Sequence, residues 1–304
     1  MPGPVTERRP LAKRSLAEAF VDTVNALRRA RVHFGQGTSD ATEEAGCLLS
    51  YVVRVAPEVL NFQRDRVLTP SEERKLNLVL TYRIKERLPA AYITREGWLR
   101  GFRFKISKHV IIPRSHIAFL LGDGLASWVS RRPSTVLDLC TGSGCLAVLA
   151  AMEYPLANIE AVDISRNATR LALQNVAAHG VADRVHVIQS DLYAGIARKV
   201  YDLIICNPPY VSARSMAMLP PEYLHEPRIA LFGGDDDGLN LVRKILHSTR
   251  RHLSPRGVLI CEVGNNRHRL ESQFPRTPFV WLDTNSPGAD VFLLPKDALP
   301  TAAD

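Results

Sequence analysis

The chain has 304 residues, of which 46% are hydrophobic and 23% are charged. This composition is that of an ordinary globular protein with room for a small and a larger domain, and it argues against a disordered chain. No apolar run is long enough to span a bilayer, and residues 1–13 lack the apolar core of a secretory signal, so we expect a cytoplasmic protein.

The net charge of +8 is unevenly distributed. Residues 1–112 hold 20 basic and 12 acidic side chains, whereas residues 113–304 hold 19 of each. A polyanionic partner such as RNA would explain this excess, and so would a scattered solvated surface. The five cysteines include no C-x-x-C pair and no histidine at metal-ligand spacing, which predicts free thiols and no metal site.

The first third of the chain is predicted to be helical. Apolar residues recur at helical spacing over residues 16–32 and 41–55, and Thr69-Pro70-Ser71-Glu72 predicts a capping box that opens a helix ending near Leu88. After Pro89 the alternating residues 98–106, broken by Gly101, predict a short hairpin. We therefore expect a helical domain over residues 1–95, a hairpin linker over 96–112 and a second domain over 113–304.

From Thr135 onward, short apolar runs alternate with helical stretches, the pattern of βαβ units. The expected strands are 135–139, 159–162, 185–188, 201–206 and 258–263, and the expected helices are 145–152, 166–179 and 239–253. Residues 279–282 and 290–294 predict an antiparallel pair at the sheet's edge. The fold class is therefore α/β, with a mostly parallel seven-stranded sheet covered by helices on both faces.

A glycine-rich turn follows the first of these strands. The stretch Asp138-Leu-Cys-Thr-Gly-Ser-Gly144 leads directly into a helix, whose amino-terminal N–H groups are free to bind a ligand. The Lys-Ser/Thr pair of a P-loop is missing and the G-x-G-x-x-G spacing is not kept, which disfavours pyrophosphate binding. A plain strand-to-helix loop is the alternative.

Acidic residues end the neighbouring strands. Asp163 closes the next strand, 25 residues after Asp138, where it would accept hydrogen bonds from two ribose hydroxyls, and Asp191 follows the third strand. Each carboxylate alone would also serve as a helix cap. Three in register after a glycine turn favour one ligand crevice at the carboxyl ends of the strands.

Four motifs in this order resemble the S-adenosylmethionine-dependent methyltransferases: D-x-x-T-G-S-G, A-V-D-I-S, S-D-L and N-P-P-Y. The resemblance covers most of the chain and implies a class I, Rossmann-like methyltransferase fold with S-adenosylmethionine as donor and S-adenosylhomocysteine as product. The donor-binding residues that it implies are Asp138, Cys140, Thr141, Gly142, Ser143, Gly144, Asp163, Asp191, Leu192 and Asn207.

More narrowly, four stretches resemble the glutamine N5-methyltransferases: I-I-P-R-S (111–115), H-E-P-R-I-A-L (225–231), D-G-L (237–239) and C-E-V-G-N (261–265). In that family a helical amino-terminal domain selects a protein substrate. Gly35-Gln36-Gly37-Thr38, the Pro-Arg-Ser form at 113–115 and C-T-G-S-G-C resemble the branch that acts on ribosomal protein three of the large subunit.

Three positions depart from the wider family. Cys140 replaces the usual glycine, and Pro113-Arg114-Ser115-His116 replaces the Pro-Arg-Pro-Glu of the release-factor branch; both changes fit the ribosomal branch. The acidic run 235–237 is one residue longer than expected, which the sequence does not explain.

The N-P-P-Y stretch carries the expected chemistry. An amide nitrogen is a poor nucleophile because its lone pair is delocalised, so it must be placed in line with the donor methyl. The carbonyls of Asn207 and Pro208 would each accept one substrate N–H, Pro208 and Pro209 would stiffen the turn, and the Tyr210 ring would support the flat carboxamide. A rigid loop is the alternative for the stretch. The resemblance implies a substrate or carboxylate contact for Arg114, which would otherwise be a surface arginine.

The sequence thus predicts an enzyme that methylates a glutamine of a large-subunit ribosomal protein, free or with ribosomal RNA in an assembly intermediate, without a metal or a membrane. Three alternatives remain open: methylation of peptide chain release factors, amino-methylation of a nucleic-acid base, and an RNA-binding assembly factor with a vestigial donor site.

Overall fold

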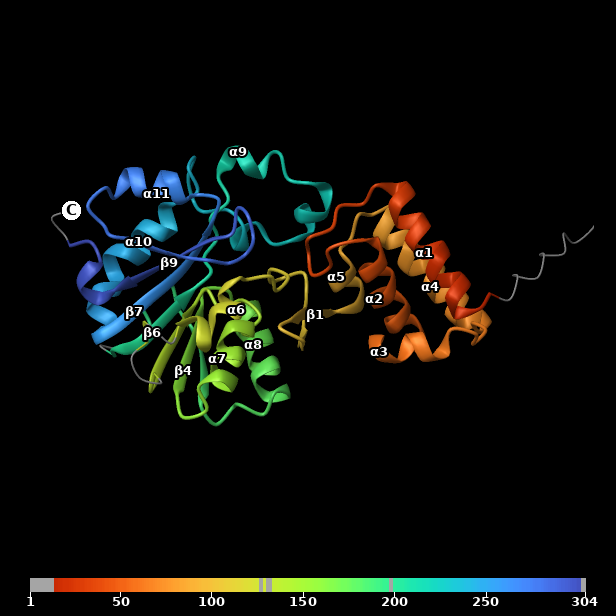
Figure 1. Ribbon diagram of the computed structural model, residues 1–304, viewed down its shortest axis with the longest axis horizontal. Helices are drawn as coiled ribbons and strands as arrows, with labels where there is room; N and C mark the ends of the chain where they lie inside the picture. The colour runs from red at the N-terminus through yellow and green to blue at the C-terminus, as the bar shows by residue number, and fades with distance from the viewer. Residues whose placement is uncertain (1–13, 126–127, 130–132, 197–198, 302–304) are drawn as a thin grey trace, which may run out of the picture. The chain divides into compact units, whose positions relative to one another are not determined.

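The computed structural model describes residues 14–125, 128–129, 133–196 and 199–301. The chain divides into two compact units, residues 1–94 and 95–304, with the boundary between Thr94 and Arg95 (Figure 1). The hairpin over residues 96–105 belongs to the second unit.

The first unit is helical, as predicted. Its elements are α1 (Leu16–Ala30), α2 (Ala41–Val53), α3 (Pro57–Leu60), η1 (Asn61–Gln63), α4 (Pro70–Ile84) and α5 (Ala90–Thr94). The capping box predicted for α4 is confirmed, since Thr69 Oγ1 accepts from the Glu72 N–H and the Glu72 carboxylate accepts from the Thr69 N–H. The predicted ends of the first two helices were too late, because Arg31 and Arg54 take left-handed conformations that end them.

The core of the first unit contains one buried ion pair. Leu48, Leu49 and Leu76 lie at its centre. Arg83 Nε donates to Glu44 Oε1 at 2.6 Å, and both side chains are almost fully buried. Arg83 also donates to the His33 carbonyl, and Thr38 donates to the Glu44 carboxylate, so the 35–38 stretch is held by this pair.

The second unit is an α/β domain. Its strands are β1 (Glu96–Leu99), β2 (Phe102–Lys105), β3 (Thr135–Leu139), β4 (Asn158–Asp163), β5 (Val185–Gln189), β6 (Tyr201–Cys206), β7 (Leu253–Gly264), β8 (Val280–Leu282) and β9 (Asp290–Pro295). Its helices are α6 (Ile117–Leu120), η2 (Asp123–Leu125), α7 (Cys145–Glu153), α8 (Arg166–Ala178), α9 (Ala213–Met216), η3 (Pro221–His225), η4 (Arg228–Ala230), α10 (Asn240–Thr249), η5 (Arg250–His252), α11 (Arg267–Gln273) and η6 (Lys296–Ala298).

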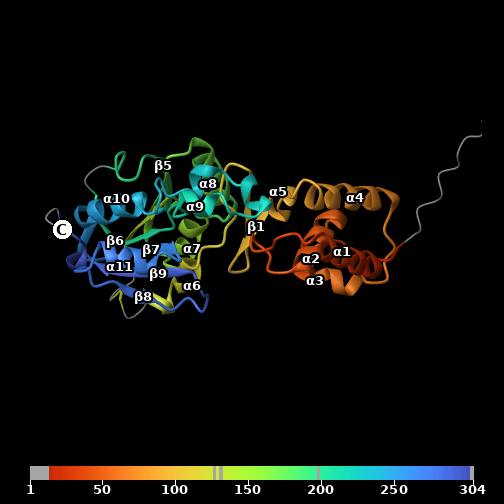
Figure 2. The ribbon, with the colours of Figure 1, turned by 90° about the horizontal axis from the view of Figure 1, so that it is seen from above.

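Seven strands form one sheet in the order β5-β4-β3-β6-β7-β9-β8. The strands from β5 to β7 are parallel, and β9 joins β7 and β8 in antiparallel pairs, which confirms the predicted edge. Helices α7 and α8 lie on one side of the sheet and α10 and α11 on the other (Figures 1 and 2). The strand order reverses between β3 and β6, the place where open α/β sheets bind their ligands.

The predicted boundary between the 239–253 helix and the strand after it was also wrong. The helix expected over residues 239–253 ends at Thr249, one 3₁₀ turn follows, and β7 begins at Leu253 rather than at Val258. Leu253 pairs with Tyr201 of β6 across a register shift. This pairing depends on a residue about fifty positions away, so local periodicity did not reveal it.

Candidate functional site

The turn after β3 is built around a buried carboxylate. Asp138 Oδ2 accepts from Thr141 Oγ1 at 2.5 Å and from the Ala147 N–H at 3.0 Å, which ties the turn to the first residues of α7. Cys140, Gly142 and Gly144 all have positive φ angles. A Cβ atom on Gly144 would lie 3.0 Å from the Ala172 side chain, so this glycine allows the turn to pack against α8.

Asp138 keeps one unsatisfied oxygen. Its side chain is fully buried, and Oδ1 has no hydrogen-bond partner among the described residues. Burial raises the pKa of Asp138 to about 7, although its bonds to Thr141 and Ala147 oppose the shift. An orphaned buried acceptor is costly, which suits a position where a ligand or water supplies the missing donor.

The carboxylate of Asp163 is held at the end of β4. Its Oδ2 accepts from the Gly142 N–H at 2.9 Å, and its Oδ1 accepts from the Ser165 N–H at 2.8 Å. Burial raises the pKa of Asp163 as well. Each oxygen has a second lone pair, so the fixed carboxylate has capacity for two hydroxyl donors, as a ribose would present.

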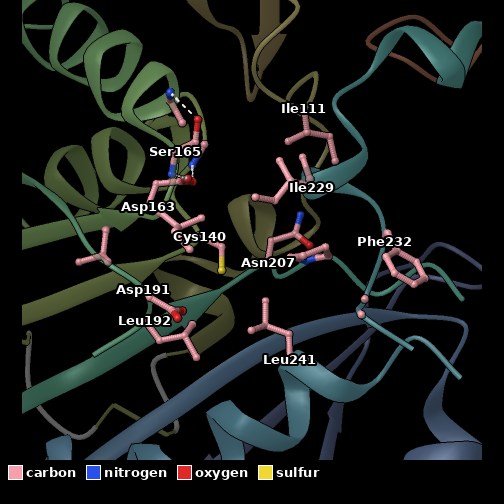
Figure 3. A pocket seen from close by; sticks show the side chains of 18 of the residues that line it. Ile111, Cys140, Asp163, Ser165, Asp191, Leu192, Asn207, Ile229, Phe232 and Leu241 are labelled. Carbon is pink, nitrogen blue, oxygen red and sulfur yellow. Dashed lines mark hydrogen bonds between the residues drawn. The ribbon is translucent and has the colours of Figure 1, made fainter. Parts of the chain in front are cut away.

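A pocket opens beyond the carboxyl ends of these strands (Figure 3). Asp163 and Asp191 lie on one side of it, Ile229 and Phe232 lie on the opposite side, and Asn207 lies between them. Seven of the predicted site residues line it: Cys140, Gly142, Asp163, Asp191, Leu192, Asn207 and Pro209. The glycine turn, the acidic strand ends and the N-P-P-Y stretch therefore meet at one cavity.

The other predicted site residues lie outside the pocket lining: Asp138, Thr141, Ser143, Gly144, Pro208, Tyr210 and Arg114. The first four form the buried floor of the glycine turn, and Pro208 is also buried. Tyr210 is directed to the β7 end, where its hydroxyl donates to Glu262 Oε1 at 3.2 Å.

Arg114 forms a two-pronged ion pair. Its two terminal nitrogens each donate to one oxygen of Glu226 at 2.7 Å, and its guanidinium also lies over the Tyr223 ring. The Glu226 side chain is fully buried. This pair ties the 113–116 stretch to the segment after N-P-P-Y, and the carboxylate that Arg114 contacts is one within the chain.

The acidic run 235–237 closes the loop before α10. Asp235 accepts from the Gly238 N–H, Asp237 accepts from the Leu239 N–H, and Arg243 of α10 donates to both carboxylates. The run is therefore used to hold the loop.

Sequence reasoning missed much of the pocket's apolar wall. The missed lining residues include Ile111, Ile229, Phe232, Asn240, Leu241 and Lys244. Asn240, Leu241 and Lys244 belong to α10, Ile229 belongs to η4, and Ile111 and Phe232 belong to connecting segments. Only their closeness to the quoted I-I-P-R-S, H-E-P-R-I-A-L and D-G-L stretches offered a signal.

The pocket fits the expected donor, S-adenosylmethionine. The Asp163 and Asp191 carboxylates in its lining suit a ligand with a net positive charge and ribose hydroxyls, and the orphaned oxygen of Asp138 in the floor of the glycine turn is a further acceptor. Apolar side chains such as Ile111, Val162 and Leu192 suit the flat base.

Two further structural findings bear on the site. The described residues contain no group of three or more His, Cys, Asp or Glu side chains suited to a metal ion. None of the helices in the described part of the chain combines the length and apolar character needed to cross a bilayer.

Comparison with known proteins gives consistent matches. The family model of the methyltransferase small domain matches residues 123–222. The chain is 46% identical over 281 residues to the ribosomal protein uL3 glutamine methyltransferase of Bordetella pertussis, a match that covers 91% of this chain and 94% of that protein. It is 40% identical over 303 residues to the protein of the same name from Burkholderia pseudomallei, with 97% and 98% covered.

Among solved structures, the catalytic domain of hMettl16 in complex with a MAT2A 3′UTR hairpin matches with a TM-score of 0.51. The sequence identity is 15%, and the match covers 81% of this chain and 91% of that one. This likeness concerns the class I methyltransferase fold alone.

Proposed function

Because the chain belongs to the family of ribosomal protein uL3 glutamine methyltransferases, we propose that it transfers a methyl group to the side-chain amide nitrogen of a glutamine in protein uL3. The methyl donor is S-adenosylmethionine, as in the wider family. The observation that carries the proposal is that Asn207 shares one pocket with Asp163 and Asp191.

The second unit's residues divide between the donor and the acceptor. We assign the donor's ribose to Asp163, its base to the wall near Asp191 and Leu192, and its charged amino acid end to the turn over Asp138. When bound, S-adenosylmethionine supplies a methyl group activated by a positively charged sulfur. The N-P-P-Y residues would therefore need only to place the substrate nitrogen.

Asn207 and Pro208 would hold the substrate carboxamide. A carbonyl acceptor from each residue takes one of the two N–H groups, which fixes the plane of the amide and favours positive charge developing on its nitrogen. The proline at 209 has no N–H, so it cannot draw the Pro208 carbonyl into a turn. After transfer the extra proton passes to water, and no strong base is required.

The helical first unit is the proposed docking domain for the protein substrate. Residues 1–95 carry much of the chain's basic excess, which supports a substrate that includes ribosomal RNA. Free uL3 and uL3 in an assembly intermediate are thus alternative substrates. The dependence of the methylation rate on salt concentration distinguishes between them.

A methylation assay with labelled donor tests the proposal. We expect transfer to uL3, located by mass spectrometry on a glutamine side chain, and little transfer to a release factor or to protein-free RNA. Preferential labelling of a release factor or of RNA would overturn the substrate assignment, and the uL3 of a knockout strain should lack the methyl group.

Replacement of Asn207 tests the site. Asn207→Ala removes one of the two carbonyl acceptors, so we expect kcat to fall about 10²–10³-fold, the usual effect of losing one such polar group. Asn158→Ala changes an exposed asparagine at the start of β4 and serves as the control with unchanged kcat. Equal kcat values for the two variants would contradict the assigned role.

A further inference from the structure

Tyr210 is held at three points by the end of β7 and the residues after it. Its hydroxyl donates to Glu262 Oε1 at 3.2 Å, and its main-chain carbonyl accepts from Asn266 Nδ2 at 3.2 Å. Its ring lies against Gly264, where an added Cβ atom would approach the ring carbon Cε2 to 2.6 Å. Since a tyrosine side chain has two main torsions, these contacts leave the ring one position.

Glu262 is a buried carboxylate with three hydrogen-bond donors. It is 2% exposed, and besides Tyr210 it accepts from Ser115 Oγ at 2.7 Å and from the His116 N–H at 2.9 Å. A buried charge is tolerated only when it is well hydrogen-bonded, and bonds to an ionised acceptor are the strong ones. Glu262 thus connects the 113–116 stretch to the tyrosine of N-P-P-Y.

The phenol of Tyr210 remains a donor. Burial and the nearby charge of Glu262 raise the pKa of Tyr210, so the hydroxyl keeps its proton across the physiological range. The bond therefore has one polarity, with the hydroxyl as donor and the carboxylate as acceptor.

We propose that Glu262 is a positioning residue for the methyl transfer, which fixes the Tyr210 ring as a support for the substrate carboxamide and is itself oriented by Ser115. This inference rests on the proposed glutamine substrate. Tyr210 and Glu262 lie outside the lining of the donor pocket, so the effect falls on the protein substrate and not on the donor. Because the ring is already fixed, less conformational entropy is lost when the substrate binds.

The bond is first tested without any substrate. With ¹³C at tyrosine Cζ, the Tyr210 resonance is assigned from Tyr210→Phe, and its chemical shift is compared at neutral pH in the wild type and in Glu262→Gln. A neutral acceptor weakens the hydrogen bond from the hydroxyl, so the resonance should move upfield in the variant. An unchanged chemical shift would overturn the proposal, whatever the enzyme's substrate is.

Kinetics then separate positioning from general support. Glu262→Gln should lower kcat/KM for uL3 on the order of tenfold, the value of one charged hydrogen bond, and Tyr210→Phe should do the same. The double variant should be no worse than the poorer single one, because both changes break one link. Donor affinity measured by calorimetry should stay within about twofold, as in the exposed-carboxylate control Asp183→Asn.

Two kinetic outcomes also overturn the proposal. One is a double variant in which the losses of the single variants multiply. The other is a loss of donor affinity in Glu262→Gln as large as its loss of kcat/KM for uL3, which would mark Glu262 as purely structural. If Glu262→Gln does not fold, Ser115→Ala takes its place, because it weakens the same carboxylate's orientation and should give a smaller loss of the same kind. A wild-type enzyme inactive on uL3 would refute the proposed function, while the Tyr210 chemical shift would still decide on the Glu262 bond.

Discussion

We expect Asp138 to make donor binding sensitive to pH. Its pKa of about 7 means that the carboxyl is mostly protonated at pH 6 and mostly ionised at pH 8. A donor with a net positive charge favours the ionised form, so binding should release a proton below pH 7, and affinity should rise about tenfold between pH 6 and pH 8.

Calorimetry in buffers of different ionisation enthalpy measures this proton release directly. Asp138→Asn removes the titrating group while it retains an acceptor for Thr141 and Ala147, and it also corrects for titration of the donor's own amino group. The variant should show a smaller pH slope. The same slope in both proteins would exclude Asp138 as the group responsible.

The sequence predicted the acidic strand ends and Asn207 because a simple rule governs them: the carboxyl ends of parallel strands meet at one edge. The partners of the 113–116 stretch could not be predicted. Glu226 binds Arg114 from 112 positions away, and Glu262 binds Ser115 from 147 positions away. Neither pairing leaves a local pattern, so the sequence left Arg114 open as a substrate or carboxylate contact or a surface arginine and predicted no partner for Ser115.

Serine at position 115 has its own consequence. Its hydroxyl is the shortest bond to Glu262, and a proline in its place, as in the release-factor branch, would offer neither this hydroxyl nor an N–H group. The Pro-Arg-Ser form therefore affects how Glu262 is oriented and, through Glu262, how Tyr210 is held.

At the scale of the element, most predicted strands agree with the observed bounds to within one residue, whereas the predicted helices 16–32 and 41–55 ended two residues late. The capping box of α4 is a local chemical signal within four residues, and the structure forms it. The start of β7 is the exception among the strands, because it depends on pairing with β6. The predicted helix 239–253 was therefore extended past the end of α10 at Thr249, through η5 and into the first residue of β7.

The α4 cap is testable by itself. Thr69→Ala removes the acceptor for the Glu72 N–H, so we expect α4 to lose about 1 kcal/mol and its amides to exchange about fivefold faster. Hydrogen exchange read by mass spectrometry over Pro70–Ile84 measures the change. Thr81→Ala removes a hydroxyl from the exposed last turn of the same helix and should leave exchange unchanged or slower. A similar acceleration of amide exchange in both variants would mean that the cap does not stabilise α4.

At the scale of the whole molecule, the two units should respond separately to damage. The buried Arg83–Glu44 pair belongs to the first unit, whereas every residue that lines the donor pocket belongs to the second. Removing one partner of a buried pair leaves the other charge buried without a partner, which lowers the free energy of unfolding by about 3–5 kcal/mol. Such a loss is large beside the usual stability of a small domain.

Arg83→Met should therefore unfold or loosen the helical unit and leave the donor site working. Amides of α1, α2 and α4 should lose protection from hydrogen exchange, and uL3 methylation should fall sharply, while the donor dissociation constant stays within about twofold of wild type. Arg74→Met changes an exposed arginine on the same helix and should have none of these effects. Loss of donor affinity in Arg83→Met would show that the units depend on each other for folding. Full methylation of uL3 by a protein with an unprotected first unit would remove the docking role assigned to residues 1–95, because the second unit would then select the substrate alone.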